Sequence, residues 1–256
     1  MPRVKISGNS IYYCSNQRKI KPDKEALLFV HGAGGSSFVW RAQFDFFQRD
    51  YQTILINLPG HGDSGGEGKS SIDGYRDFVR GFLDALGLKS VWIIGHSMGG
   101  AIAISLAFNA HERLNGLVLV GTGAKLKVAP MIFQALEGDF ETAIRQSAQL
   151  SFAKDTAQDI IDAHIKEMLK GKPGVMINDF RACDKFDVRE QLPDIDLPTL
   201  IICGDEDQLT PTRYSEYLRE RIKDSQLNII NGAGHMVAVE KPEEFNSILG
   251  QFLLRK

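Results

Sequence analysis

Short apolar runs and amphipathic stretches alternate along most of this chain. The apolar runs occupy residues 26–30, 53–58, 91–94, 116–120, 200–203 and 227–230. Runs of this length without polar interruption are typical of strands covered on both faces of a sheet. Residues 71–86 instead repeat apolar side chains at three- and four-residue steps and predict a helix, and helices are also predicted at residues 38–47 and 242–253. Alternating strands and helices predict an α/β protein with a mostly parallel sheet, preceded by a hairpin within residues 4–14.

This alternation stops between residue 122 and about residue 193. The segment contains only helical patterns, at residues 130–136, 140–152, 156–170 and 173–185. Because it follows a predicted strand, it would cover the edge of the sheet where open α/β folds bind ligands. We therefore predict a core domain made of residues 1–121 and 194–256, and an all-helical cap made of residues 122–193.

The sequence Gly95-His96-Ser97-Met98-Gly99 joins a buried strand directly to an apolar helix. A strand that turns into a helix with a serine at the apex is the nucleophile elbow of the G-x-S-x-G pattern. The serine backbone is strained in such a turn, and side chains two residues away on either side would collide, so glycine is needed there. Ser97 would then stand at a helix N-terminus, which favours the oxyanion that forms when a serine attacks a carbonyl.

A second serine fits the same pattern, in Gly62-Asp63-Ser64-Gly65-Gly66. This string is similar to the nucleophile segment of chymotrypsin-type proteases, in which the serine follows its His and Asp within a β protein. Here only 63 residues precede Ser64, and no strand-to-helix change surrounds it. We interpret Ser64 as a turn residue.

A serine nucleophile needs a base to take its proton and a carboxylate to orient that base, in the chain order Ser, acid, His. The histidines that follow Ser97 are His111, His164 and His235. His111 lies just past the elbow helix, and His164 lies within a predicted helix among polar neighbours. His235 lies in a glycine-rich loop after the last strand, so we predict His235 as the base. The loop after the preceding strand offers Asp205, Glu206 and Asp207 as the acid, and spacing alone does not choose among them.

With these motifs the sequence resembles the α/β-hydrolase fold family, in its compact form with a helical cap. The resemblance covers nearly the whole chain outside the cap and rests on His31-Gly32, Pro59-Gly60-His61-Gly62-Asp63-Ser64, Gly95 to Gly100, Gly204-Asp205-Glu206-Asp207 with Pro211, and Gly234-His235. It implies an eight-stranded, mostly parallel sheet flanked by helices. It also implies that Asp207 is the triad acid, with Asp205 less favoured.

The resemblance further implies an oxyanion hole formed by the backbone N–H groups of Met98 and Ala33, with Gly34 as the second candidate beside Ala33. His31, His61 and His96 lie in tight glycine turns, and we predict that they shape loops through hydrogen bonds to the backbone. Asn57 departs from the family pattern, because relatives usually have an acid there. This departure is expected to change local hydrogen bonding and not catalysis.

The predicted function is a carboxylesterase for short to medium acyl chains, acting through Ser97, His235 and Asp207. Relatives that use Asp at the elbow, the haloalkane dehalogenases and epoxide hydrolases, are disfavoured by Ser97. A thioesterase, a lactonase and a hydrolase of carbon–carbon bonds remain open, since loops and cap residues set the pocket. A receptor that senses a ligand with slow turnover is a further alternative. Gly34, Phe133 and Met131 are predicted to contact the substrate.

Composition excludes several other classes of protein. The chain of 256 residues is 43% apolar and 24% charged with a net charge of −2, so no nucleic-acid partner is expected. We expect no cofactor and no metal, because the sequence lacks a P-loop, a dinucleotide fingerprint and metal-ligand spacing. The three cysteines show no CxxC spacing, and neither disulfides nor zinc are expected. Without a signal sequence or an apolar run near ~18 residues, a cytoplasmic protein with no stable membrane association is expected. The expected partner is a small ester with an apolar acyl group, and a homodimer is left open.

Overall fold

The computed structural model describes residues 2–254, and an eight-stranded sheet forms its centre. The strands are β1 (Arg3–Ile6), β2 (Asn9–Ser15), β3 (Ala26–Val30), β4 (Gln52–Ile56), β5 (Val91–His96), β6 (Leu114–Val120), β7 (Thr199–Gly204) and β8 (Ser225–Ile230). Their order across the sheet is β1-β2-β4-β3-β5-β6-β7-β8. β1 and β2 pair antiparallel with their neighbours, whereas β4, β3 and β5 to β8 run parallel. The predicted hairpin and the mostly parallel sheet are therefore confirmed.

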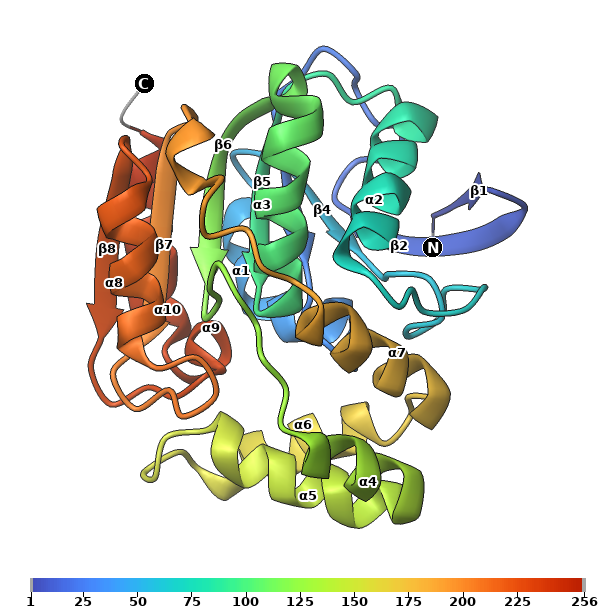
Figure 1. The fold of residues 1–256 in the computed structure, drawn as a ribbon. Helices are drawn as coiled ribbons and strands as arrows, with labels where there is room; N and C mark the ends of the chain where they lie inside the picture. The colour runs from blue at the N-terminus through green and yellow to red at the C-terminus, as the bar shows by residue number, and fades with distance from the viewer. Residues whose placement is uncertain (1, 255–256) are drawn as a thin grey trace.

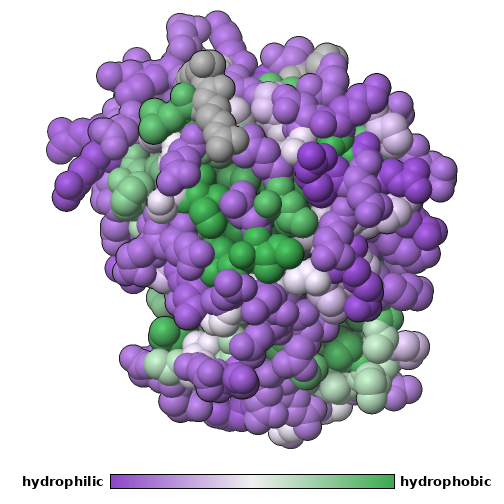
Figure 2. Space-filling view, turned by 90° about the vertical axis from the view of Figure 1, so that its left-hand side faces the viewer, coloured by the Kyte–Doolittle hydropathy of each residue, from purple (hydrophilic) through white to green (hydrophobic). Residues whose placement is uncertain are grey.

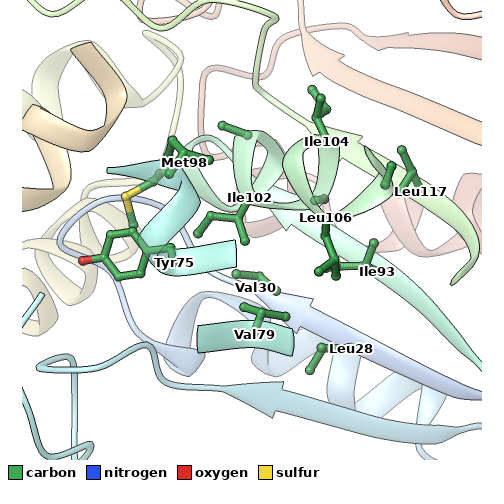
Figure 3. Close-up of a cluster of buried hydrophobic side chains, with 14 of the residues drawn as sticks. Leu28, Val30, Tyr75, Val79, Ile93, Met98, Ile102, Ile104, Leu106 and Leu117 are labelled. Carbon is green, nitrogen blue, oxygen red and sulfur yellow. The ribbon is translucent and has the colours of Figure 1, made fainter. Parts of the chain in front are cut away.

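Helices cover both faces of this sheet (Figure 1). They are α1 (Arg41–Phe47), α2 (Ile72–Leu86), α3 (Met98–Ala110), α4 (Pro130–Gly138), α5 (Phe140–Ser151), α6 (Gln158–Met168), α7 (Pro173–Asp184), α8 (Thr212–Arg221), α9 (Val237–Glu240) and α10 (Pro242–Leu253), with short 3-10 helices at Ser37–Trp40, His111–Arg113 and Leu192–Asp194. Side chains alternate across a strand, so Leu28 and Val30 of β3 join a cluster with α2 and α3, while Leu27 and Phe29 join a cluster with α1 and α10. Figure 3 shows the first cluster, which also contains Met98.

Local sequence accounts for both ends of α2, whereas α8 and the short α9 were not predicted. The Ser71 side chain accepts a hydrogen bond from the Gly74 N–H at the start of α2, and Gly87 ends that helix with a φ of 65°. Helix α8 was not predicted, because only Ser215 and Leu218 are buried on it and its apolar pattern is therefore weak.

The segment after β6 forms a separate helical layer. Helices α4, α5 and α6 lie below the ends of the strands to which the arrowheads of β6 and β8 point, and α7 lies between them and the sheet (Figure 1). The layer has its own apolar cluster, which includes Leu136, Ile144, Ile165 and Met176. The four helices match the four predicted helical patterns. The domain boundaries at residues 122 and 193 stay a prediction.

The face at the β8 end of the sheet is mostly hydrophilic, with one apolar area near its middle (Figure 2). β8 is the last strand of the sheet, and its Ile229 is 40% exposed. A homodimer stays a prediction.

Within residues 2–254, none of the helices is both long enough and apolar enough to cross a membrane.

Candidate active site

The turn between β5 and α3 has the geometry that the sequence predicts. Ser97 adopts a φ of 53°, in the left-handed region that side chains rarely occupy. A Cβ on Gly95 would overlap the backbone of Gly99, and a Cβ on Gly99 would overlap the carbonyl of Val30. The Ser97 N–H donates to the carbonyl of Val120 on β6 at 2.8 Å, which fixes the turn against the sheet. The strained serine and the need for glycine on both sides are confirmed.

His235 and Asp207 form a buried pair near this turn. Nδ1 of His235 lies 2.9 Å from Oδ2 of Asp207, which also accepts a hydrogen bond from the Thr210 hydroxyl at 2.8 Å. The second carboxylate oxygen accepts the N–H groups of Leu209 and Thr210. Burial alone would raise the pKa of Asp207, but His235 and the hydrogen bonds from Thr210 outweigh it and hold that pKa well below its usual value. Asp207 is therefore an anion that can orient the imidazole.

Asp205, the other candidate acid, lies outside the pair of His235 and Asp207. It is exposed, and its Oδ1 accepts the backbone N–H of Gly232 at 2.7 Å, at the start of the loop that carries His235. The structure thus brings Asp207 to His235 and leaves Asp205 to shape the loop, a distinction that spacing alone could not make.

His96 links the serine turn to the histidine loop. It precedes Ser97, and its Nε2 lies 2.9 Å from the backbone carbonyl of His235, with the two rings 4.6 Å apart. Burial and the neighbouring His235 lower the pKa of His96 to about 3, so the ring is neutral. Just after β6, a Cβ at Gly121 would lie 3.3 Å from Nδ1 of His235. The carboxyl ends of neighbouring strands therefore gather all three triad candidates, as open α/β folds do at their ligand sites.

The predicted loop-shaping histidines bond to backbone groups. Nδ1 of His31 bonds to the Gly32 carbonyl, and its Nε2 accepts the Leu58 N–H. Nδ1 of His61 bonds to the Pro59 carbonyl. The prediction for these residues and for His96 is confirmed.

The loop after β3 lies over the serine turn, and some of its backbone N–H groups are already bonded to the protein. A Cβ at Gly32 would lie 3.1 Å from Cβ of Ser97. The Gly34 N–H donates to Asp179 at 2.8 Å, and the Gly35 N–H donates to the Gly32 carbonyl at 3.2 Å. In contrast, no acceptor within residues 2–254 bonds to the backbone N–H of Ala33 or Met98. These two groups could receive an oxyanion.

Sequence reasoning did not identify Asp179 on α7, which is fully buried. Its Oδ2 accepts the Gly34 N–H and lies 2.7 Å from Nε2 of His61, while its Oδ1 accepts the Tyr75 hydroxyl. Burial and the Asp179 charge raise the pKa of Tyr75 far above its usual value. The ring of His61 thus lies between two acceptors, the Pro59 carbonyl and the Asp179 carboxylate. One signal in the sequence was available, since Asp179 lies among apolar residues of a predicted helix.

A second carboxylate joins the helical layer to the histidine loop. Glu240 on α9 accepts the Gly234 N–H at 2.9 Å through Oε1. Its other oxygen accepts the Ala153 N–H at 2.8 Å and the Thr156 hydroxyl at 2.6 Å, both between α5 and α6. The layer is thus bonded to both loops that flank Ser97.

Ser64 of the second G-x-S-x-G string has a structural environment. It is buried, donates to the Asn57 carbonyl at 2.8 Å and accepts the Tyr12 N–H at 3.0 Å. The side chain of Asn57 accepts the Ser37 N–H at 2.6 Å, which is a local bond of the kind expected at this departure from the family pattern. Ser64 therefore stabilises the loop after β4, in agreement with its interpretation as a turn residue.

The three predicted substrate contacts lie in different surroundings. Gly34 lines a cavity of about 640 Å³ together with residues such as Phe38, His61 and Met176, and none of the three triad candidates lines it. Met131 is 68% exposed on α4, and Phe133 packs against the apolar cluster of the helical layer. Neither lines this cavity, and substrate contact stays a prediction for all three. Within residues 2–254, no three His, Cys, Asp or Glu side chains are arranged to hold a metal ion.

Comparison with known proteins agrees with this geometry. The sequence profile of the alpha/beta hydrolase family matches residues 27–248. The chain is 27% identical to pimeloyl-(acyl-carrier protein) methyl ester esterase of Neisseria meningitidis, over 93% of this chain and 80% of the relative. It is 30% identical to 3-oxoadipate enol-lactonase 2 of Acinetobacter baylyi, over 88% of this chain and 86% of the relative. The solved structure of a thermophilic esterase superposes with a TM-score of 0.85 at 31% identity, over 98% of this chain and 96% of that one. The predicted fold is thereby confirmed.

Proposed function

Since the chain belongs to the alpha/beta hydrolase family, we propose that it is a serine hydrolase that cleaves carboxylic esters through an acyl-enzyme. Ser97 is the nucleophile, His235 the general base and Asp207 the orienting acid. The observation that carries the proposal is the pairing of His235 Nδ1 with buried Asp207 at 2.9 Å beside a serine in a strained elbow. All three residues were proposed from the sequence, and their contacts support the assignment.

The tautomer of His235 follows from its partners. Its Nδ1 faces the Asp207 carboxylate, so Nδ1 carries the proton and Nε2 keeps the lone pair that can accept the Ser97 proton. When Nε2 takes that proton, the imidazolium is stabilised by the Asp207 anion. His235 then gives the proton to the leaving alcohol. Water attacks the acyl-enzyme in the second half of the reaction, with His235 again as the base.

The oxyanion that forms on the carbonyl is held by the backbone N–H groups of Ala33 and Met98. Each such donor is typically worth about 3–4 kcal/mol in the transition state. The bond from the Gly34 N–H to Asp179 supports Ala33 over Gly34 for this role, because one N–H cannot serve both acceptors well. Met98 has a completely buried side chain, which favours a fixed N–H at the start of α3.

The names of two relatives support esters as the class of substrate. One relative is named as a methyl ester esterase and another as an enol-lactonase, and lactones are cyclic esters. We propose esters with short to medium apolar acyl groups as substrates. A lactonase is the second candidate, favoured by the relative named as one, and it needs no change in the triad chemistry. Residues 122–193 act as a cap over the substrate, and the protein works in the cytoplasm without a cofactor.

The test is hydrolysis of p-nitrophenyl esters, from acetate to palmitate, by the wild type, Ser97→Ala and Ser64→Ala. We expect turnover by the wild type with an optimum at short to medium chains, loss of turnover in Ser97→Ala, and retention in Ser64→Ala, which lies in the second G-x-S-x-G string. A fluorophosphonate probe should add mass to Ser97 alone. Turnover that survives Ser97→Ala would disprove the assignment of the nucleophile.

A further inference from the structure

Helix α6 crosses from one of the catalytic loops to the other. At its beginning, Ile160 and Ile161 pack against the apolar cluster that contains Phe152 and Met236, next to His235. Phe152 in turn lies against Gly234, since a Cβ on Gly234 would come 2.7 Å from the Phe152 carbonyl carbon.

At its other end, α6 reaches the loop that carries Ala33. Cε of Met168 lies 3.1 Å from the position of a Cβ on Gly34, and Glu167 accepts a hydrogen bond from the Ser36 hydroxyl at 3.0 Å. Because the loops of Ala33 and His235 flank Ser97, the middle of α6 lies over the reaction centre.

His164 occupies this middle position on the face that α6 turns toward the core. It comes three residues after Ile161 and four before Met168, spacings that share one helix face. The next residue, Ile165, belongs to the apolar cluster of the helical layer, against which Ile161 and Met168 also pack. The His164 side chain is 9% exposed, and its ring lies edge-on to Phe152 with centroids 5.2 Å apart. Among the polar neighbours of His164 in the sequence, Asp162 and Lys166 are exposed, whereas His164 itself is buried.

The ring of His164 differs from those of the other buried histidines. The rings of His31, His61, His96 and His235 each bond to a protein group. No group in residues 2–254 hydrogen-bonds to the ring of His164, and its nitrogens are not among the buried polar atoms that are closed off from solvent without a partner. A small molecule at the proposed reaction centre can therefore reach this imidazole and supply the partner that the protein does not.

Its charge state fits this role. Burial and the nearby His235 lower the pKa of His164 to about 4, with Glu167 acting in the opposite direction. At neutral pH the ring therefore offers one N–H donor and one lone pair, and it can bond to a hydroxyl or a carbonyl.

We propose that His164 hydrogen-bonds a polar group of the substrate beside the scissile ester, so that the enzyme prefers esters with a hydroxyl or carbonyl there over wholly aliphatic ones. This inference rests on the proposed function, because it takes Ser97 as the reaction centre. A site built to bond a substrate hydroxyl discriminates against the analogue that lacks it, because the protein group then stays buried and unpaired.

The experiment compares two pairs of esters that differ by a hydroxyl in place of a methyl group. Methyl 3-hydroxybutanoate against methyl 3-methylbutanoate tests the acyl side, and 2-hydroxyethyl butanoate against propyl butanoate tests the alcohol side. In at least one pair, the wild type should prefer the hydroxyl ester by about tenfold or more in kcat/KM. His164→Leu should remove this preference, and His164→Gln should restore part of it.

Ile165→Ala is the matched control, since it disturbs the adjacent position of α6 without touching the polar site. It should keep the wild-type ratio. The proposal is overturned if the wild type prefers neither hydroxyl ester, or if His164→Leu keeps the preference. Thermal melting of each variant separates unfolding from a change of specificity.

A binding measurement separates this proposal from the proposed function. Calorimetric titration of the same esters into Ser97→Ala needs no turnover. A hydroxyl preference there that disappears in the Ser97→Ala, His164→Leu double variant supports the role of His164 even if no ester is hydrolysed. Turnover without any hydroxyl preference in kcat/KM or in binding disproves the role of His164 and leaves the proposed function standing.

Discussion

The carboxylate of Asp179 accepts the backbone N–H of Gly34 at 2.8 Å, which joins helix α7 to the loop beside Ser97 across 145 residues of sequence. The same carboxylate pairs with His61 and accepts the Tyr75 hydroxyl. Gly34 has a φ of 64°, so the loop bends sharply at the residue that Asp179 holds. Asp179 therefore fixes the course of the loop that presents the Ala33 N–H, without touching the reacting atoms.

Asp179→Asn should lower kcat by about tenfold or more with a smaller change in KM, because a misplaced oxyanion donor weakens the transition state more than the bound substrate. It should also reduce the free energy of unfolding by about 1–3 kcal/mol, since a buried Asn cannot accept hydrogen bonds from Gly34, His61 and Tyr75 together. Steady-state kinetics and urea unfolding measure the two effects. Tyr75→Phe is the control, since it removes one bond to the same carboxylate and leaves Gly34 bound. If Tyr75→Phe lowers kcat as much as Asp179→Asn, a positioning role for Asp179 is excluded.

Ser97 and His235 should act as one unit. Each single replacement by alanine should lower kcat by on the order of 10⁴ or more, whereas adding His235→Ala to Ser97→Ala should change the residual rate by less than about threefold. The base has no proton to remove once the serine hydroxyl is absent. Single-turnover hydrolysis of a p-nitrophenyl ester by the two single variants and the double variant measures this. Two independent, multiplicative losses would contradict the triad.

The glycines of the elbow should tolerate no side chain. Gly95→Ala places a Cβ against the backbone of Gly99, and this backbone cannot move aside as a flexible side chain can. We therefore expect the free energy of unfolding to fall by more than about 3 kcal/mol. Gly174→Ala is the matched control, because a Cβ there meets no atom within 4 Å and the residue lies in α7. It should leave stability unchanged or raise it by up to about 1 kcal/mol. Thermal melting compares the two, and equal melting temperatures would refute the steric argument.

Acid should destabilise the protein well above the pH at which carboxylates titrate. The pKa of His96 is lowered to about 3 and that of His164 to about 4, while burial also lowers that of His31. Unfolded histidines titrate near about 6.5, so the unfolded chain binds more protons below that pH. The stability that these groups contribute is complete above about pH 6.5 and is lost as the pH falls toward their folded pKa values.

His164→Leu removes one of these groups. Between about pH 4.5 and 6, the fall of unfolding free energy with pH should be smaller than in the wild type by about 1 kcal/mol per pH unit. Urea unfolding at several pH values measures the slope. Ile165→Ala should change the stability but not the slope, and an unchanged slope in His164→Leu would show that His164 keeps an ordinary pKa.

The sequence patterns that predicted the structure correctly depend only on residues close together in the chain. The elbow could be recognised from six residues, because a strained serine between two glycines depends on neighbours in the chain. The apolar runs predicted the core strands for the same reason. Helix α8 was missed, because only two of its residues, Ser215 and Leu218, are buried. Which residues of this helix are buried depends on its contacts in the fold, and the local sequence does not show it.

By itself the sequence determined the order of the strands and of most helices, the helical layer after β6, and the candidates Ser97 and His235. The tertiary structure decided what depends on distance in space. It set Asp207, and not Asp205, against His235, it buried His164 against Phe152, and it brought Asp179 to Gly34. These contacts join residues far apart in the chain, and a carboxylate or an imidazole acquires its role from the groups that folding places around it.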